Sequence, residues 1–174
     1  MKGVELWQRA YPGLSWMKDA YALANKLGLR PEDLSPVPED GLYDLALRAV
    51  EEHVPRGSTV LDAGAGTLDF SVELAKRGYR VVAVEINPRM LQIGKVHEPF
   101  PGDLIIVRAN FLKFWARYDA VVMLNSSWTS PLPVEWEDKT VITDAWWNGL
   151  SGRVLVIKEG KLVQQYTRVA LEKV

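Results

Sequence analysis

Short runs of almost wholly apolar residues recur between residues 58 and 124. Four of them have the length of a β-strand: Thr59–Ala63, Arg80–Val84, Leu104–Val107 and Ala120–Leu124. Runs that are apolar throughout predict strands buried on both faces, as in a parallel sheet. A helical segment that Gly78 ends separates the first two runs, and Asn87–Pro88 opens another helix after the second. This alternation predicts a doubly wound α/β core, with a mostly parallel sheet and helices on both faces.

The chain on either side of this core has different patterns. Residues 1–57 are expected to form an N-terminal helical cap, with a helix from Ser15 to Gly28, a proline-bearing loop and a second helix capped by Asp40. Residues 129–174 contain three strand-like runs, Lys139–Thr143, Arg153–Ile157 and Leu162–Val169. Glu159–Gly160 predicts an antiparallel hairpin between the last two runs. We therefore expect a single domain over residues 1–174, made of the cap, an α/β core over 58–128 and a shortened C-terminal set of strands.

Composition narrows the class of protein further. The 174 residues are 48% hydrophobic and 25% charged, which excludes a disordered chain. Lys and Arg total 21 against 22 Asp and Glu, so the positive excess of a free-standing nucleic-acid-binding protein is absent. Because the chain has no cysteine, disulfides, cysteine-ligated metals and thiol nucleophiles are excluded. The sequence also has no run of membrane-spanning length and no apolar core of a signal peptide, so we expect a cytoplasmic protein without a membrane partner.

The sequence VLDAGAG, residues 60–66, is the most informative motif because it joins a predicted strand to a predicted helix. Gly64 and Gly66 allow the backbone to turn tightly and to approach a ligand at the helix N-terminus. A P-loop would need Gly-Lys-Ser/Thr after the glycines, and this triplet is absent. A dinucleotide fingerprint would need a glycine where Asp69 stands, and we expect that carboxylate to crowd and repel a pyrophosphate.

This motif resembles the first motif of class I S-adenosylmethionine-dependent methyltransferases, in which an acid stands two residues before the first glycine, as Asp62 does here. The resemblance implies the cofactor S-adenosyl-L-methionine, whose cationic groups tolerate nearby acids. It implies that Glu85 accepts the ribose hydroxyls, that Ile86 packs on the adenine and that Asn110 accepts from the adenine amino group. The full set of implied cofactor contacts is Asp62, Ala63, Gly64, Ala65, Gly66, Glu85, Ile86, Asn110, Phe111 and Asn125. One departure is Leu68, where many members have a third glycine.

The fourth predicted strand ends in Asn125–Ser126–Ser127–Trp128. Members of the family that methylate planar amines, such as adenine or glutamine side chains, have Asn/Asp-x-Pro-aromatic at this place. The resemblance implies that Asn125 accepts hydrogen bonds from the target amine and that Trp128 stacks on it, which makes these two residues the catalytic candidates. No metal site is expected, and the two histidines are expected to be structural.

Several alternatives stay open at this stage. The acceptor is unidentified and ranges over a small molecule, RNA or a protein side chain, and the oligomeric state is undetermined. Because both prolines of the amine-binding motif and the third glycine are missing, a non-catalytic S-adenosylmethionine-binding regulatory or interaction module is the main alternative to an enzyme. The third possible function is that of a dinucleotide-dependent enzyme.

Overall fold

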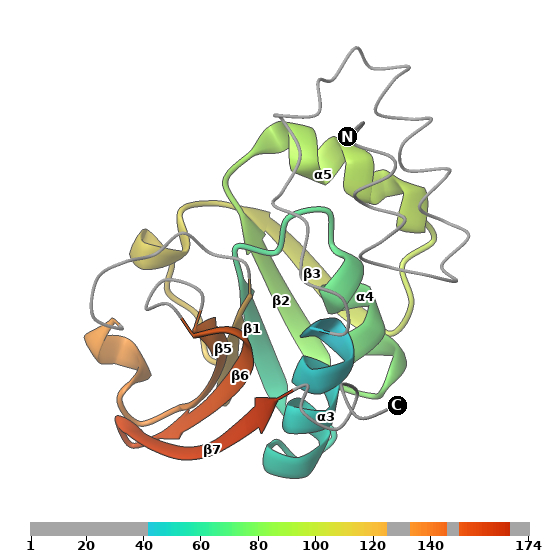
Figure 1. Cartoon of the computed structure of the whole chain (residues 1–174). Coiled ribbons are helices and arrows are strands. Elements are labelled where there is room, and N and C mark those ends of the chain that lie inside the picture. Colours follow the sequence, from blue (N-terminus) through green and yellow to red (C-terminus); the bar gives the residue numbers. More distant parts are fainter. Residues whose placement is uncertain (1–41, 125–132, 146–149, 168–174) are drawn as a thin grey trace.

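The computed structural model describes residues 42–124, 133–145 and 150–167. In them a single sheet has the strand order β3-β2-β1-β4-β5-β6-β7 (Figure 1). The first five strands run parallel, and β6 is antiparallel to both β5 and β7. The mostly parallel sheet and its antiparallel C-terminal hairpin are therefore confirmed. The strands are β1 (Thr59–Ala63), β2 (Arg80–Glu85), β3 (Asp103–Arg108), β4 (Ala120–Met123), β5 (Thr140–Ala145), β6 (Leu150–Lys158) and β7 (Lys161–Thr167).

The local signals that bound these elements work as the sequence predicts. β1 has the predicted limits, and the other strands begin and end within three residues of theirs. The Asn87 side chain accepts a hydrogen bond from the Arg89 amide at 3.0 Å, with Pro88 as the first helical residue. Glu159 and Gly160 both have positive φ, 52° and 70°, as a tight hairpin turn requires. The helix predicted over 15–28 and the Asp40 cap lie outside the described residues.

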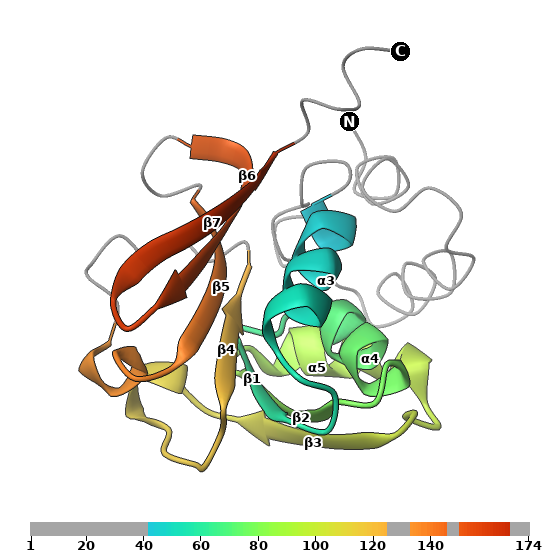
Figure 2. The ribbon, with the colours of Figure 1, turned by 90° about the horizontal axis from the view of Figure 1, so that it is seen from below.

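The three α-helices of the described ranges all pack against one face of the sheet (Figure 2). They are α3 (Leu42–His53), which covers β5, β6 and β7, and α4 (Asp69–Lys76) and α5 (Pro88–Gly94), which cover the β2 side. None of them has the length and apolar character needed to cross a lipid bilayer. The expectation of helices on both faces is thus wrong for these parts of the chain.

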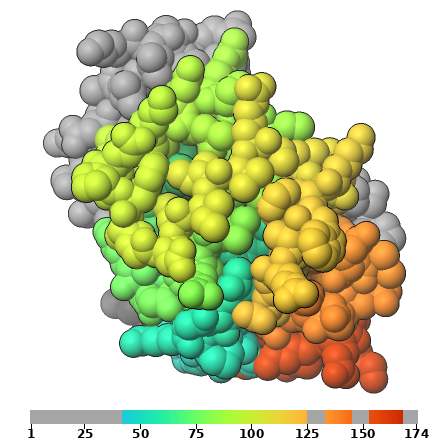
Figure 3. Space-filling view, turned by 180° about the vertical axis from the view of Figure 1, so that it is seen from behind, coloured from blue at the N-terminus to red at the C-terminus, as the bar shows by residue number. Residues whose placement is uncertain are grey.

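The other face is covered by short 3₁₀ turns and extended segments. These turns are η3 (Phe111–Lys113) and η4 (Val134–Trp136), while a third, η2 (Lys95–His97), continues α5. The connection between β3 and β4 is too short for a crossover helix, and its Phe111 and Phe114 side chains pack directly on the strands instead. Seen from behind, the surface there is formed largely by β3 and the segment after it, with residues after 133 beside them (Figure 3).

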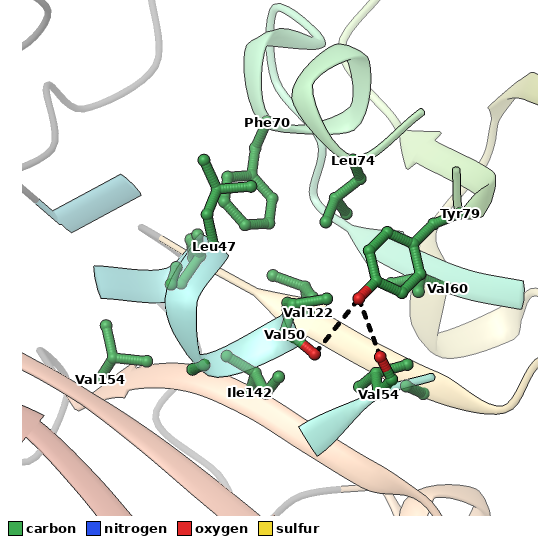
Figure 4. Packing of buried hydrophobic residues seen from close by; sticks show 14 of the residues in the cluster. Leu47, Val50, Val54, Val60, Phe70, Leu74, Tyr79, Val122, Ile142 and Val154 are labelled. Atoms are coloured by element: carbon green, nitrogen blue, oxygen red, sulfur yellow. Dashed lines mark hydrogen bonds between the residues drawn. The ribbon is translucent and has the colours of Figure 1, made fainter. Parts of the chain in front are cut away.

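The main core lies between the helices and the sheet (Figure 4). Phe70 and Leu74 of α4 and Val50 of α3 meet apolar side chains of the central strands there. Tyr79, which precedes β2 and is 1% exposed, donates a hydrogen bond of 2.8 Å from its hydroxyl to the Val54 carbonyl just after α3. This buried bond fixes the end of α3 against β2, and so holds the helical layer over the strands that lead to the glycine turn.

Candidate cofactor-binding site

The glycine turn, residues 64–68, lies at the carboxyl end of β1, the central strand at which the order of the sheet reverses (Figure 1). Open α/β sheets bind ligands at such a switch point. Gly64 and Gly66 have φ of 73° and 59°, values that glycine adopts without steric cost. The amides of Gly64 and Ala65 both donate to the Val84 carbonyl, at 2.9 and 3.0 Å. The turn is therefore held against β2 by backbone hydrogen bonds.

Glu85, the last residue of β2, connects the turn to α5. One of its carboxylate oxygens accepts from the Gly66 amide at 2.8 Å, and the other accepts from the Asn87 amide at 2.8 Å. Each carboxylate oxygen can accept more than one hydrogen bond, so both retain capacity for the hydroxyl groups of a ligand. The next residue, Ile86, is 60% exposed, which leaves an apolar surface beside this carboxylate.

Asp62 lies beneath the turn and is 3% exposed. One of its oxygens accepts from the Ser71 hydroxyl of α4 at 2.5 Å. Burial raises the pKa of Asp62 to about 7, and the nearby charges of Glu85 and Asp69 act in the same direction. Burial therefore favours the neutral form of Asp62, which leaves the partly buried Glu85 as the acidic side chain of the turn that would attract a cationic ligand.

Asp69 does not project toward a ligand, which corrects the expectation that it would crowd a pyrophosphate. It is 4% exposed, and its two oxygens contact the His97 Nε2 at 2.9 Å and the Thr67 hydroxyl at 2.8 Å. Burial raises the pKa of this carboxyl, while the His97 and Thr67 contacts act to lower it. A steric block by Asp69 is therefore not an argument against a dinucleotide at this turn.

The residues after β3 approach the same turn. The Asn110 side-chain oxygen accepts a hydrogen bond from the Leu112 amide at 3.0 Å and so caps η3. This bond occupies one of the two acceptor positions of that oxygen, and the predicted adenine contact would use the other. The Phe111 ring lies beside the turn, since a Cβ added to Gly64 would be 3.8 Å from its Cε1 atom. On its other side the ring stacks on Trp136, with centroids 6.0 Å apart.

The structure therefore brings most of the predicted cofactor-binding residues to one place, and their contacts with a cofactor stay predictions. Ala63 and Ala65 are buried within the turn region. Asn125 and Trp128 lie outside the described residues.

Sequence reasoning missed the supporting side chains Ser71 and His97, because their partners are 9 and 28 residues away and no pattern marks them. Among the residues that are described, no group of three or more acidic or histidine side chains is placed to hold a metal ion.

Comparison with known proteins decides the family of this region. A family model described as a methyltransferase domain matches residues 60–138, which include the glycine turn, Glu85 and Phe111. Residues 60–138 belong to that family. The resemblance drawn from VLDAGAG and Glu85 is thus confirmed, and with it the class I methyltransferase fold of the sheet.

Individual relatives cover different parts of the chain. The magnesium-protoporphyrin O-methyltransferase of Rhodobacter capsulatus is 51% identical over 43 residues, which are 25% of this chain and 19% of that protein. A dimethyladenosine transferase from Plasmodium falciparum is 16% identical with a TM-score of 0.50, over 64% of this chain and 44% of that one. A magnesium protoporphyrin IX methyltransferase from Synechocystis PCC 6803, solved with bound S-adenosylmethionine, is 18% identical with a TM-score of 0.49, over 81% and 69%. The methyltransferase domain thus shares its fold with the dimethyladenosine transferase, while the chain spans about a fifth of the curated relative.

Proposed function

We propose that this protein is an S-adenosylmethionine-dependent methyltransferase. The observation that carries the proposal is the Glu85 carboxylate, which ends β2, holds the Gly66 amide at 2.8 Å and stands beside the exposed Ile86. The family match of residues 60–138 supports the same activity. Since the curated relative matches over only 43 residues, its acceptor is not transferred to this chain.

The residues around the turn fit the chemical groups of this cofactor. S-adenosylmethionine, when bound, supplies a methyl group on a positively charged sulfonium. Glu85 offers unused acceptor positions for two ribose hydroxyls, and Ile86 offers an apolar surface for the adenine. The Glu85 side chain is also the acidic group that would face the positive charge of the ligand, because it is only partly buried. The protein would accelerate transfer mainly by orienting the two reactants, as intramolecular reactions gain most from proximity.

For the acceptor we propose a planar amine, held by Asn125 and Trp128. The support is the order Asn-x-x-aromatic directly after β4, where an amide oxygen can accept from an amine and an indole can stack on a flat group. An amine nucleophile needs little help from a base, which agrees with the absence of an obvious general base in the motif. Binding of the cofactor without turnover remains the alternative function.

Calorimetric titration with S-adenosylmethionine, its demethylated product and NAD tests the cofactor. We expect saturable binding of the first two and none of NAD. Glu85→Ala removes charge-assisted hydrogen bonds of about 1.5–3 kcal/mol each, so affinity should fall by roughly tenfold or more. Asp138→Ala is the matched control, because it removes an exposed carboxylate just before β5, at the amino ends of the parallel strands, whereas Glu85 lies at their carboxyl ends. Equal affinity in both variants would contradict the role of Glu85.

Transfer of a labelled methyl group tests the acceptor. The screen begins with adenosine-containing oligoribonucleotides and small planar amines, using the wild type, Asn125→Ala, Trp128→Ala and the control Ser126→Ala. Loss of transfer in the first two variants, with cofactor affinity unchanged, is the expected result. If transfer survives both changes, the acceptor residues are wrong. If no acceptor is methylated while the cofactor binds, the non-catalytic function replaces the enzyme.

A further inference from the structure

A buried histidine–carboxyl pair contacts the glycine turn through Thr67. His97 ends η2, and Asp69 begins α4, 28 residues earlier in the chain. The His97 Nε2 and the Asp69 Oδ1 are 2.9 Å apart, and the two side chains are 6% and 4% exposed. The other Asp69 oxygen accepts from the hydroxyl of Thr67, which belongs to the turn itself, at 2.8 Å. A continuous chain of contacts thus runs from η2 to the turn.

The same segment also supports the turn through packing. Gly94 ends α5, directly before η2, and a Cβ added there would be 3.1 Å from the Thr67 carbonyl oxygen and 2.8 Å from the Leu68 side chain. The backbone of α5 therefore lies against the turn with no space between them. Together with Glu85, which holds the Gly66 amide, these contacts fix three consecutive residues of the turn from two sides.

Burial of a histidine–carboxyl pair is a poor way to gain stability. The cost of removing a carboxylate from water usually offsets the attraction between the partners, so apolar side chains of similar size would hold α4 against η2 as well. What apolar side chains would not provide is a directed contact that ends on the Thr67 hydroxyl. The pair therefore has its clearest use in setting the geometry of the turn.

We propose that His97 is a positioning residue of the glycine turn and acts through Asp69 and Thr67. It holds residues 64–68 in the conformation that presents the turn and Glu85 to the ligand. That the ligand is S-adenosylmethionine rests on the proposed function, whereas the ordering of the turn does not. The two parts are therefore measured separately.

Amide hydrogen exchange of the ligand-free protein measures the ordering of the turn directly. His97→Leu should speed exchange in the peptide that contains residues 64–68 by roughly tenfold relative to the β4 peptide. His97→Gln retains a donor close to the position of Nε2 and should restore slow exchange. The control is His53→Leu, which removes the other histidine of the chain; His53 ends α3 and makes an exposed side-chain contact with Gln164 at 2.6 Å. Unchanged exchange at 64–68 in His97→Leu would overturn the proposal.

The double variant His97→Leu/Asp69→Asn separates positioning from stability. Because it also replaces the buried carboxyl, which would have lost its histidine partner, with an amide that cannot ionise, it should recover most of the melting temperature that His97→Leu loses. Exchange at 64–68 should nevertheless remain fast, and the affinity for S-adenosylmethionine should stay roughly tenfold below that of the wild type. If turn exchange recovers together with stability, the pair is only structural and the proposal fails. A wild type that binds no S-adenosylmethionine would overturn the proposed function, while the exchange result would still decide the role of His97.

Discussion

Leu68 is the residue at which the glycine turn departs most from ordinary backbone geometry. It has φ 70° and ψ 11°, in the left-handed region, and is 1% exposed. A side chain in that region costs about 1–2 kcal/mol, which explains why many members of the family have glycine here. In this chain the Leu68 side chain packs with Ala65 and Ala83, so its burial offsets the backbone strain.

Two truncations of Leu68 should therefore rank in an unusual order. Both Leu68→Ala and Leu68→Gly lose the buried side chain, at about 2–5 kcal/mol for the alanine variant. At an ordinary helical position alanine is the more stable of the two, but the left-handed φ reverses this preference. We expect Leu68→Gly to unfold at a urea concentration no lower than Leu68→Ala, and to be more stable by about 1 kcal/mol. If Leu68→Ala is more stable than Leu68→Gly, the backbone of residue 68 is not strained.

At the scale of single residues, the sequence could predict those whose type is required by local backbone or ligand chemistry. Gly64, Gly66 and Glu85 fall in this class, and the structure brings all three together. The His97–Asp69 contact could not be predicted, because it depends on how α5 and η2 pack across 28 residues of chain. Asn110 illustrates an intermediate case, in which the position is correct but its oxygen also caps η3.

Among the elements, α5 depends on glycine for its contact with the turn. A Gly→Ala change in a helix normally stabilises it by about 1 kcal/mol. Gly94→Ala should instead lower the melting temperature and weaken cofactor binding, because its Cβ would lie 3.1 Å from the Thr67 carbonyl oxygen and 2.8 Å from Leu68. Gln92→Ala, on the exposed side of α5, is the control for helix propensity. Thermal unfolding and calorimetry of both variants check this, and a Gly94→Ala protein that gains stability and keeps its affinity would contradict it.

Strands were easier to predict than the helices that cover them. A strand buried on both faces must be apolar along its whole length, so β1, β2 and β4 are visible in the sequence. Whether the connection between two parallel strands forms a helix depends on the residues that it packs against. The local sequence pattern does not show those tertiary contacts. After β3 the aromatic residues Phe111 and Phe114 could have extended an α-helix, yet they pack on the sheet from the single 3₁₀ turn η3 and the extended residue after it.

For the molecule as a whole, the buried Asp62 links stability to pH. Its pKa is about 7 in the folded protein against 3.8 ordinarily, so between these values the folded state keeps a proton that the unfolded state has lost. The contribution of this group to the free energy of unfolding therefore falls as pH rises from about 4 to about 7, and is constant above that.

Asp62→Asn removes this titration. The wild type loses the contribution of Asp62 as pH rises, whereas the variant does not. The stability of Asp62→Asn relative to the wild type should therefore increase from pH 5 to pH 8. Urea unfolding of both proteins at the two pH values measures the change. Ser71→Ala serves as a comparison, because it removes the hydroxyl that the Asp62 carboxyl accepts from and leaves the titrating group in place. A difference between Asp62→Asn and the wild type that does not vary with pH would refute the link.

The order of the sheet has a consequence for synthesis of the chain. On one side Val60 of β1 pairs with Val81, 21 residues ahead, and on the other with Ala120, 60 residues ahead. Closing the longer loop costs only about 1 kcal/mol more in chain entropy. The delay before β4 pairs with β1 is therefore set by the time that the ribosome needs to synthesise the chain up to β4. Until residue 122 has emerged, one side of β1 has no neighbour to pair with. For that interval the central strand of the finished molecule is an edge strand, open to pairing with another chain.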